Sequence, residues 1–121
     1  MSVENVWEKN GVYRKYANSV DGEEVTKAME EVHANILFDS ISYVINDYLD
    51  VSDYDITTAD VITLAALDRA AALSNPNIKI AFVLTESASL VLAKLYGDLI
   101  NKSPYISEIF ASVEEARAWA V

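Results

Sequence analysis

The residues best suited to chemistry form an acidic segment in the middle of the chain. Positions 47–60 contain no lysine or arginine and hold five aspartates: Asp47, Asp50, Asp53, Asp55 and Asp60. Carboxylate oxygens at the C-terminal ends of parallel strands are ligands that Mg²⁺ accepts. Carboxylates are equally typical of solvated loops, where their charges face helix N-termini. We predict such a solvated acidic loop, with a metal site as the alternative.

Within this segment, the spacing of Asp53, Asp55 and Thr57 imitates the D-x-D-x-T motif of haloacid-dehalogenase-type phosphatases. That motif requires an apolar strand directly before its first aspartate, whereas polar residues interrupt positions 49–52. The sequence also lacks an obvious downstream acidic pair to complete a metal site. A metal-assisted hydrolase at Asp53 and Asp55 is therefore the least favoured of three functions, and we expect no metal or other cofactor.

Other sequence patterns that carry catalysis are missing. The chain has no cysteine, and its one histidine, His33, lies beside the apolar stripe of a predicted helix, where it faces solvent or a boundary. No serine occupies a G-x-S-x-G turn, and the three scattered glycines form neither a G-x-G-x-x-G motif nor a Walker A loop. We therefore predict that the protein is not an enzyme.

The composition favours one folded domain over residues 1–121. Hydrophobic residues make up 52% of the chain, which is enough for a continuous core, and the formal net charge is −10. This charge argues against binding to nucleic acid, whose phosphates attract lysine and arginine, and against anionic membrane surfaces. The sequence shows no signal peptide and no apolar stretch long enough to span a membrane, so we expect a soluble, cytoplasmic protein.

The elements that position these residues follow from turn signals, helix caps and hydrophobic spacing. Asn10-Gly11 between two Val-, Trp- and Tyr-rich runs predicts a hairpin closed by a type I′ turn, with positive φ at both residues. Caps at positions 21, 57, 85–87 and 112 predict helix starts. The predicted strands are 3–8, 12–16, 41–49, 78–84 and 105–110, and the predicted helices are 22–35, 57–74, 85–103 and 112–120.

This order, β-β-α-β-α-β-α-β-α, indicates the α/β fold class. Strands that alternate with helices of crossover length imply right-handed parallel connections, and the hairpin adds an antiparallel edge. The nearly continuous apolar run at 78–84 is typical of a strand covered on both faces. We predict a mixed, mostly parallel five-stranded sheet with helices packed on both faces.

Hydrophobic spacing also predicts the buried face of each helix. The stripes are Val25, Met29, Val32 and Ile36 on the first helix, and Ala88, Val91, Leu92, Leu95 and Leu99 on the third. Leu90 lies outside the second stripe, and Tyr96 and Ile100 widen it beyond what one sheet face needs. A second apolar surface on a small domain predicts self-association, so we expect a homodimer.

Four segments spread over the chain combine into a family pattern. They are Gly11-Val12-Tyr13, Asp21-Gly22-Glu23-Glu24, Ser74-Asn75-Pro76-Asn77-Ile78-Lys79-Ile80-Ala81 and Ile109-Phe110-Ala111-Ser112-Val113-Glu114-Glu115-Ala116-Arg117-Ala118-Trp119. Together they resemble the SpoIIAA-like group of STAS-fold proteins, and the last segment, F-x-S-x-E-E-A-x-x-W, is the most specific. The resemblance implies a bacterial cytoplasmic protein whose fold is shared with anti-sigma-factor antagonists and related to the lipid-carrying CRAL-TRIO fold. Because most members of the group have no assigned activity, the resemblance concerns architecture more than function.

The resemblance also singles out a candidate phosphoacceptor. In phosphorylated STAS regulators, a serine in a D-S-S-G motif begins the helix after the strand that corresponds to 41–49. Here Asp55 matches the aspartate, Thr57 takes the position of the second serine with Thr58 beside it, and Ala59 replaces the glycine. A phosphate at a helix N-terminus is favoured by the helix dipole. The favoured interpretation is that Thr57 is only an N-cap, because the motif is incomplete and the neighbouring aspartates repel a phosphate.

Aromatic residues are the remaining functional signal. They are Trp7, Tyr13, Tyr16, Tyr43, Tyr48, Tyr54, Phe82, Tyr96, Tyr105 and Trp119. Such residues form cores or anchor interfaces, and in a CRAL-TRIO relative they line an apolar pocket. We predict a non-catalytic regulatory or interaction module with an unidentified protein partner. The alternative is a carrier of a small apolar, lipid-like ligand, and the candidate surface for ligand or partner comprises Asp53, Asp55, Leu90 and Tyr96.

Overall fold

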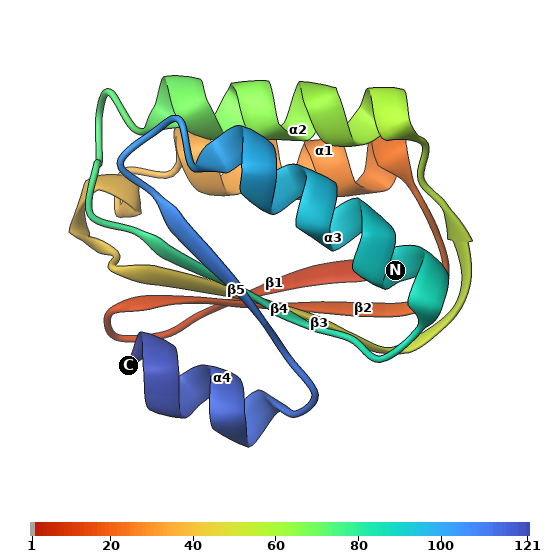
Figure 1. The fold of residues 1–121 in the computed structure, drawn as a ribbon. Coiled ribbons are helices and arrows are strands. Elements are labelled where there is room, and N and C mark those ends of the chain that lie inside the picture. Colours follow the sequence, from red (N-terminus) through yellow and green to blue (C-terminus); the bar gives the residue numbers. More distant parts are fainter. Residues whose placement is uncertain (1) are drawn as a thin grey trace.

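The computed structural model describes residues 2–121 as a mixed β-sheet with helices on both of its faces (Figure 1). The strands are β1 (Val3–Trp7), β2 (Gly11–Asp21), β3 (Tyr43–Asp55), β4 (Lys79–Val83) and β5 (Ile106–Phe110). The helices are α1 (Gly22–Ala34), η1 (Phe38–Ser40, a short 3-10 helix), α2 (Thr58–Ala71), α3 (Ser87–Ile100) and α4 (Val113–Ala120). Every predicted strand and helix is present, which confirms the predicted fold class.

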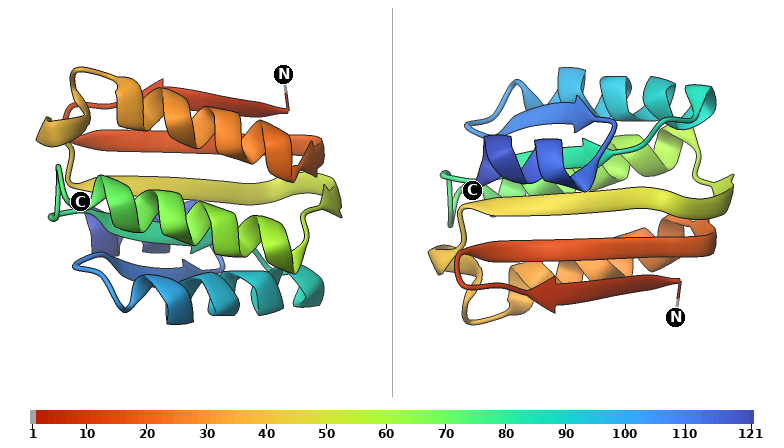
Figure 2. Two further views of the ribbon diagram at one scale, coloured as in Figure 1. Left: turned by 90° about the horizontal axis from the view of Figure 1, so that it is seen from above. Right: turned by 90° about the horizontal axis from the view of Figure 1, so that it is seen from below.

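The strands lie in the sheet in the order in which they occur in the chain. β1 pairs antiparallel with β2, and β2 to β5 are mutually parallel. Crossovers of one hand that advance in one direction place their helices on a single face, and α1, α2 and α3 lie side by side there (Figure 2). α4 follows the last strand and folds back over the opposite face, where it packs on β3, β4 and β5.

The first hairpin forms, but its turn differs from the prediction. The bend falls at positions 9–10, and the Glu8 amide donates to the Gly11 carbonyl at 2.8 Å. Within residues 2–121 only Asn18 has a positive φ, so the predicted type I′ turn at Asn10-Gly11 is wrong. The glycine is needed for space instead, because a Cβ at this position would lie 2.5 Å from ring atoms of Tyr43.

The acidic segment is mostly a strand, so the predicted loop is wrong. β3 has 13 residues and ends at Asp55, well beyond the predicted end at Leu49. β4 pairs with β3 only as far as Asp47, whereas β2 accompanies it to Asp55. The second half of β3 is therefore part of a two-stranded arm with a free edge, where charged side chains are tolerated. Val51 of this arm is buried against the core, which holds the segment extended.

Three of the four predicted helix caps form as side-chain hydrogen bonds. The capping oxygens belong to Asp21, Thr57 and Ser112. At α2 the cap is reciprocal, because Thr57 Oγ1 accepts from the Asp60 amide at 3.1 Å and Asp60 Oδ2 accepts from the Thr57 amide at 2.9 Å. No side-chain hydrogen bond caps α3, which begins at Ser87.

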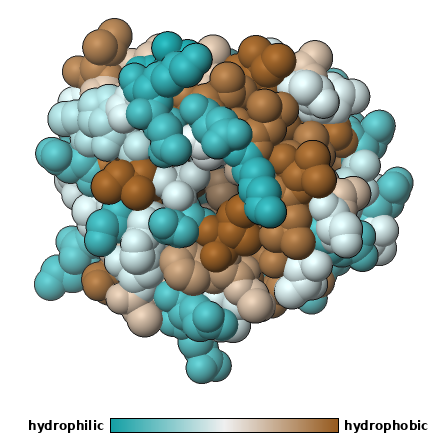
Figure 3. Space-filling view, viewed as in Figure 1, coloured by the Kyte–Doolittle hydropathy of each residue, from teal (hydrophilic) through white to brown (hydrophobic). Residues whose placement is uncertain are grey.

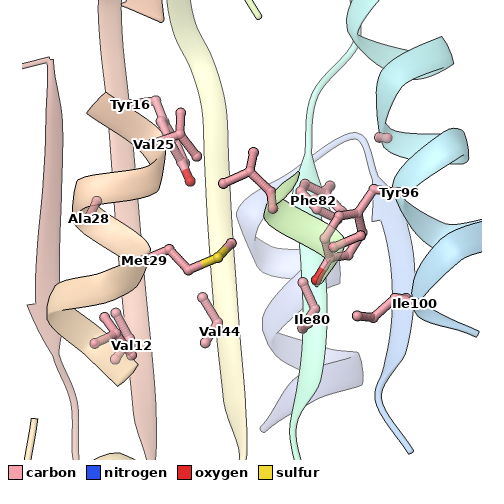
Figure 4. Packing of buried hydrophobic residues seen from close by; sticks show 14 of the residues in the cluster. Val12, Tyr16, Val25, Ala28, Met29, Val44, Ile80, Phe82, Tyr96 and Ile100 are labelled. Atoms are coloured by element: carbon pink, nitrogen blue, oxygen red, sulfur yellow. The ribbon is translucent and has the colours of Figure 1, made fainter. Parts of the chain in front are cut away.

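Two hydrophobic clusters lie on the two sides of the sheet. The larger lies between the sheet and α1 to α3, where Met29 extends over β3 and Tyr96 meets Phe82 edge to face at 5.1 Å (Figure 4). The smaller lies under α4 and includes Ile45 and Ala116. Successive strand side chains thus enter opposite clusters, as the period of two requires.

Two of the predicted helix stripes need correction. Ile36 lies beyond the end of α1 and is 95% exposed. On α3 the predicted stripe is rotated, because Val91 is 67% exposed. The residues that α3 buries are Ser89, Ala93, Tyr96 and Ile100. This helix is apolar around most of its circumference, so its spacing did not determine which side meets the sheet.

Candidate functional site

A group of polar side chains lies inside the larger cluster, between the sheet and α1 to α3. Arg14 lies on β2 between Val12 and Tyr16, which are fully buried on the helix-facing side of the sheet. Asn46 lies beside it on β3, because the parallel register pairs Arg14 with Asn46. Arg14 is 3% and Asn46 4% exposed, so the alternation that builds the core also buries these two polar groups.

Arg14 has hydrogen-bond partners but no ionic partner. Its Nε donates to Asn5 Oδ1 at 2.7 Å and its Nη1 to Asn46 Oδ1 at 3.2 Å. The Tyr16 hydroxyl donates to the same Asn46 oxygen at 2.8 Å. Within residues 2–121 no carboxylate lies at ion-pair distance from the guanidinium. These bonds engage two of the five guanidinium N–H groups, and the group stays charged at any physiological pH.

Asp68 is the nearest buried acid, and other donors already hold it. The Tyr96 hydroxyl donates to Asp68 Oδ2, and His33 Nε2 lies 2.9 Å from Asp68 Oδ1. Burial raises the pKa of Tyr96 well above its ordinary value, and the charge of Asp68 raises it further, so the phenol keeps its proton and donates. Asp68 thus receives a bond at each oxygen, while Arg14 lacks a comparable partner. His33 does lie at a boundary, as predicted, and it pairs with an acid there.

Tyr105 carries a buried hydroxyl without any hydrogen-bond partner among residues 2–121. The residue is 2% exposed and lies just before β5. Burial raises the pKa of its phenol, and the charges of Asp68 and Asp39 raise it further, so it too remains a donor. A buried polar atom without a partner costs about 1–3 kcal/mol and marks a place where a water or ligand belongs.

Arg14 and Tyr105 line the same chamber. It has about 40 Å³ of space for water centres, and its polar wall also includes Asn46, His33 and Asp68. A second chamber of about 50 Å³ lies next to it, between the sheet, α2 and α3. Its lining is nearly all apolar: Tyr48, Tyr54, Ile56, Val61, Leu64, Phe82, Leu84, Ser89, Leu92, Ala93 and Tyr96. The chambers share Tyr48, Leu64, Phe82 and Tyr96, so a polar end adjoins an apolar one.

Aromatic rings line both chambers where they adjoin. Tyr16 stacks on Tyr48 with ring centroids 4.0 Å apart, and Tyr48 lies 6.4 Å from Phe82, which meets Tyr96. These residues and Tyr54 and Tyr105 are the predicted aromatics that line the chambers. The others lie elsewhere: Tyr13 and Tyr43 pack beneath α4, Trp119 belongs to α4 itself, and Trp7 lies beside α1.

The predicted phosphoacceptors are exposed at the N-terminus of α2. The Thr57 hydroxyl is engaged as the cap of this helix. Asp60, its capping partner, packs on the backbone of Gly22, where a Cβ would lie 2.3 Å from the Asp60 carboxyl carbon. Thr58 is the first residue of the helix. The cap is confirmed, and phosphorylation at Thr57 or Thr58 stays a prediction.

The predicted ligand or partner surface is divided in the structure. Asp53 and Asp55 are exposed on the arm of β3, and residues 2–121 contain no group of three side chains suited to a metal ion. Tyr96 is 5% exposed, so it lies inside and not on a partner surface. Leu90 is partly buried on α3, beside the exposed Val91. Figure 3 shows hydrophobic residues gathered along this helix, and homodimer formation there stays a prediction.

The opposite face of the sheet carries a polar network in which every charge has a partner. Arg117 of α4 donates to both oxygens of Glu8 at 2.9 and 2.7 Å, and the Tyr43 hydroxyl donates to Glu8 at 2.6 Å. The hydrogen bond from Arg117 lowers the pKa of Glu8 against the opposing effect of burial. Nearby, Lys15 bonds Asp47 at 3.1 Å.

The Tyr13 hydroxyl also donates to the buried carboxylate of Asp47. Burial raises the pKa of Tyr13 to about 12, and the hydrogen bond to Asp47 and its charge add to the effect. For Asp47 itself, burial acts to raise the pKa, but the bonds from Tyr13, the Leu49 amide and Lys15 lower it overall. This network ties the strands and α4 together, and each of its two cations, Arg117 and Lys15, has a carboxylate partner.

The sequence analysis did not identify Arg14, Asn46 or Asp68. One signal was available for Arg14, because it alternates with Val12 and Tyr16 at strand spacing, which places a charged residue on the buried side. Asn46 follows the same rule between Val44 and Tyr48 on β3. Asp68 had no such signal within its alanine- and leucine-rich helix.

The fold is that of an α/β protein of the SpoIIAA-like type. One similar structure is an uncharacterized protein of the DUF3478 family with a SpoIIAA-like fold from Shewanella loihica, at a TM-score of 0.60 and 12% identity, covering 98% of this chain and 92% of that one. Another is the Bacillus cell fate determinant SpoIIAA in its phosphorylated form, at a TM-score of 0.58 and 12% identity, covering 96% of each chain. These similarities confirm the predicted architecture.

Sequence comparison adds no functional information. No protein-family model matches the chain, and no curated protein matches it significantly. At 12% identity the two structures show a shared fold alone. Among residues 2–121, none of the helices is both long and apolar enough to cross a membrane.

Proposed function

We propose that this protein is a non-catalytic regulatory module whose state is set by a small molecule bound between the sheet and α1 to α3. The observation that carries the proposal is that two buried donors line one chamber: Tyr105, whose hydroxyl has no hydrogen-bond partner among residues 2–121, and Arg14, which has no ion pair there. Buried donors of this kind are almost always satisfied by protein, water or ligand. A regulatory role agrees with the SpoIIAA-like fold, which also occurs in a cell fate determinant.

α3 connects the chambers to the surface. Ser89, Ala93 and Tyr96 on its inner side line the apolar chamber, and Tyr96 reaches the polar one as well. Its outer side exposes Val91. A molecule in the chambers therefore contacts one side of a helix whose other side offers apolar area to a protein partner, such as a second copy of this chain. Occupancy and partner binding are thereby coupled through a single element.

Native mass spectrometry of protein purified gently from its source cells tests the proposal. We expect a stoichiometric guest of low mass. Ala93→Leu fills part of the apolar chamber and should reduce the guest-bound fraction several-fold. Ala88→Leu is the matched control, because Ala88 lies on the same helix but is exposed. Hydrogen exchange of α3 should slow in the guest-bound protein relative to protein stripped of its guest.

Two results would contradict this function. One is an empty wild-type protein in the native spectrum together with α3 exchange that no small molecule changes. The other is equal loss of guest in Ala93→Leu and Ala88→Leu, which would place any bound molecule outside the chambers.

A further inference from the structure

We propose that the bound small molecule is a monocarboxylic acid with a short hydrocarbon body, whose carboxylate accepts hydrogen bonds from Arg14 and Tyr105. This inference rests on the proposed function and names the chemistry of the occupant. The hydrocarbon body lies in the apolar chamber, toward Phe82 and Leu92.

Charge selects an anion for the polar chamber. A guanidinium 3% exposed, with no carboxylate at ion-pair distance within residues 2–121, is rare because arginine is almost never fully buried without a partner. Asp68 lies beyond ion-pair distance of it, and the Asp68 oxygens are directed to Tyr96 and His33 instead. Water can accept hydrogen bonds from Arg14 and Tyr105 but supplies no negative charge.

Geometry favours a carboxylate among small anions. A planar guanidinium with free N–H groups matches the two oxygens of a carboxylate, and charge-assisted bonds of this kind are the stronger ones. The Tyr105 hydroxyl adds a further donor from the β5 side of the same chamber. Asp68 also lines this chamber and repels any anion, so a dianion such as phosphate is disfavoured more strongly than a monocarboxylate.

The size and polarity of the second chamber define the rest of the molecule. The two chambers offer about 40 and 50 Å³, and one water needs about 10–15 Å³ by this measure, which leaves room for roughly six to nine non-hydrogen atoms. Ser89 is the one non-aromatic residue with a polar side chain in the apolar chamber, and its hydroxyl already donates to the Glu86 carbonyl at 2.9 Å. A chain of a few methylene groups matches this lining, because it is apolar and needs no hydrogen bonds.

The test compares an acid with its neutral amide on the full chain. Sodium hexanoate and hexanamide differ in charge and hardly in shape, and each is titrated into the ¹⁵N-labelled protein while its NMR spectrum is recorded. We expect hexanoate to shift the resonances of residues that line the chambers and to bind at least tenfold more tightly than hexanamide. Arg14→Met should lower hexanoate affinity at least tenfold and leave that of hexanamide unchanged.

Two further variants separate binding from folding. Arg69→Met removes an exposed arginine next to Asp68 on α2 and should leave both affinities within twofold. Tyr105→Phe removes one hydroxyl, retains the guanidinium, and should weaken hexanoate binding about tenfold, since a hydrogen bond to a charged group is lost. This variant keeps the test decisive if Arg14→Met fails to fold.

Two results would overturn the carboxylate assignment. One is equal affinity for hexanoate and hexanamide, and the other is an unchanged hexanoate affinity in both Arg14→Met and Tyr105→Phe. Either result would still agree with a module that binds a neutral ligand. If neither probe binds, the guest in the native spectrum decides: a carboxylic acid supports the assignment, and any other guest overturns it. An empty native spectrum with neither probe bound would overturn the assignment and the proposed function together.

Discussion

The two faces of the sheet differ in how they hold an arginine: Arg117 on the α4 side is half-buried, whereas Arg14 on the opposite side is buried. Beneath α4, Arg117 makes a bidentate ion pair with Glu8, and Tyr43 completes the carboxylate's bonds. Beneath α1 to α3, the side-chain partners of Arg14 among residues 2–121 are the amide oxygens of Asn5 and Asn46, and Arg14 faces a chamber. A network with all its charges paired inside the chain holds structure together, whereas an unpaired charge at a cavity is suited to an outside partner. The difference marks which face is structural and which is available for binding.

The largest effect is expected on the helix side, from Asp68→Ala. The substitution leaves the Tyr96 hydroxyl and His33 without their acceptor and removes a negative charge that raises the pKa of Arg14. We expect a loss of about 3 kcal/mol in the free energy of unfolding, measured by urea denaturation. Asp98→Ala, at an exposed acid on α3, is the control and should change stability by less than about 0.5 kcal/mol. A small loss in the free energy of unfolding of Asp68→Ala would mean that water solvates the polar side chains of the chamber.

The next effect concerns the α4 side and its close packing. In Gly11→Ala, the new Cβ would lie 2.5 Å from the Tyr43 ring, whose hydroxyl holds Glu8. Overpacking of this kind typically destabilises by about 1–3 kcal/mol, and we expect about 2 kcal/mol in thermal or urea unfolding. If the clash is the cause, the double variant Gly11→Ala with Tyr43→Leu should lose less than the sum of the two single changes.

A smaller, pH-dependent effect is expected from Glu8→Gln. The bond from Arg117 lowers the pKa of Glu8 below its ordinary value of 4.5, so the charged form favours the folded state. The wild type should exceed the variant by about 1 kcal/mol above pH 5, and this gap should close as the pH falls below 4.5 through the folded pKa. Glu4→Gln, at an exposed position of β1, should show no such closing gap. A gap that persists at low pH would contradict the ionic origin.

The smallest effect distinguishes the two arginines directly. Arg117→Met should lose about 1 kcal/mol, because Glu8 loses its bidentate partner. Arg14→Met should change the stability of the ligand-free protein by less than about 1 kcal/mol, because it removes an unpaired buried charge and no ion pair. Urea unfolding of both variants measures the difference. A loss of several kcal/mol in Arg14→Met would show that this arginine is structural after all.

Local signals predicted the elements well because their causes are local. The reciprocal cap of Thr57 and Asp60 joins residues three positions apart, and it forms as expected. The sequence-based predictions fail where contacts with residues distant in the chain determine the structure. The acidic segment reads as a loop by itself, but pairing with β2 extends it to Asp55. α3 is apolar on most sides, and only its contact with the sheet turns Tyr96 inward.

The candidate site shows the same division between what local sequence predicts and what distant contacts determine. Strand alternation at Val12, Arg14 and Tyr16 indicates that an arginine points into the core. No sequence rule says whether a carboxylate lies within ion-pair distance of it. The surroundings of the arginine depend on Asp68 from α2 and on Tyr105, which directly precedes β5. The crossovers bring both residues to one chamber.

By itself, the sequence determined the α/β class, the order of the elements and three of the four helix caps, because these depend on hydrophobic period and on hydrogen bonds between near neighbours. The tertiary structure alone decided that Glu8 meets Arg117 across the length of the chain and that Arg14 forms no ion pair with a carboxylate of residues 2–121. The pairing of buried charges is set by which elements pack together. It therefore emerges only when the sheet and its helices are assembled.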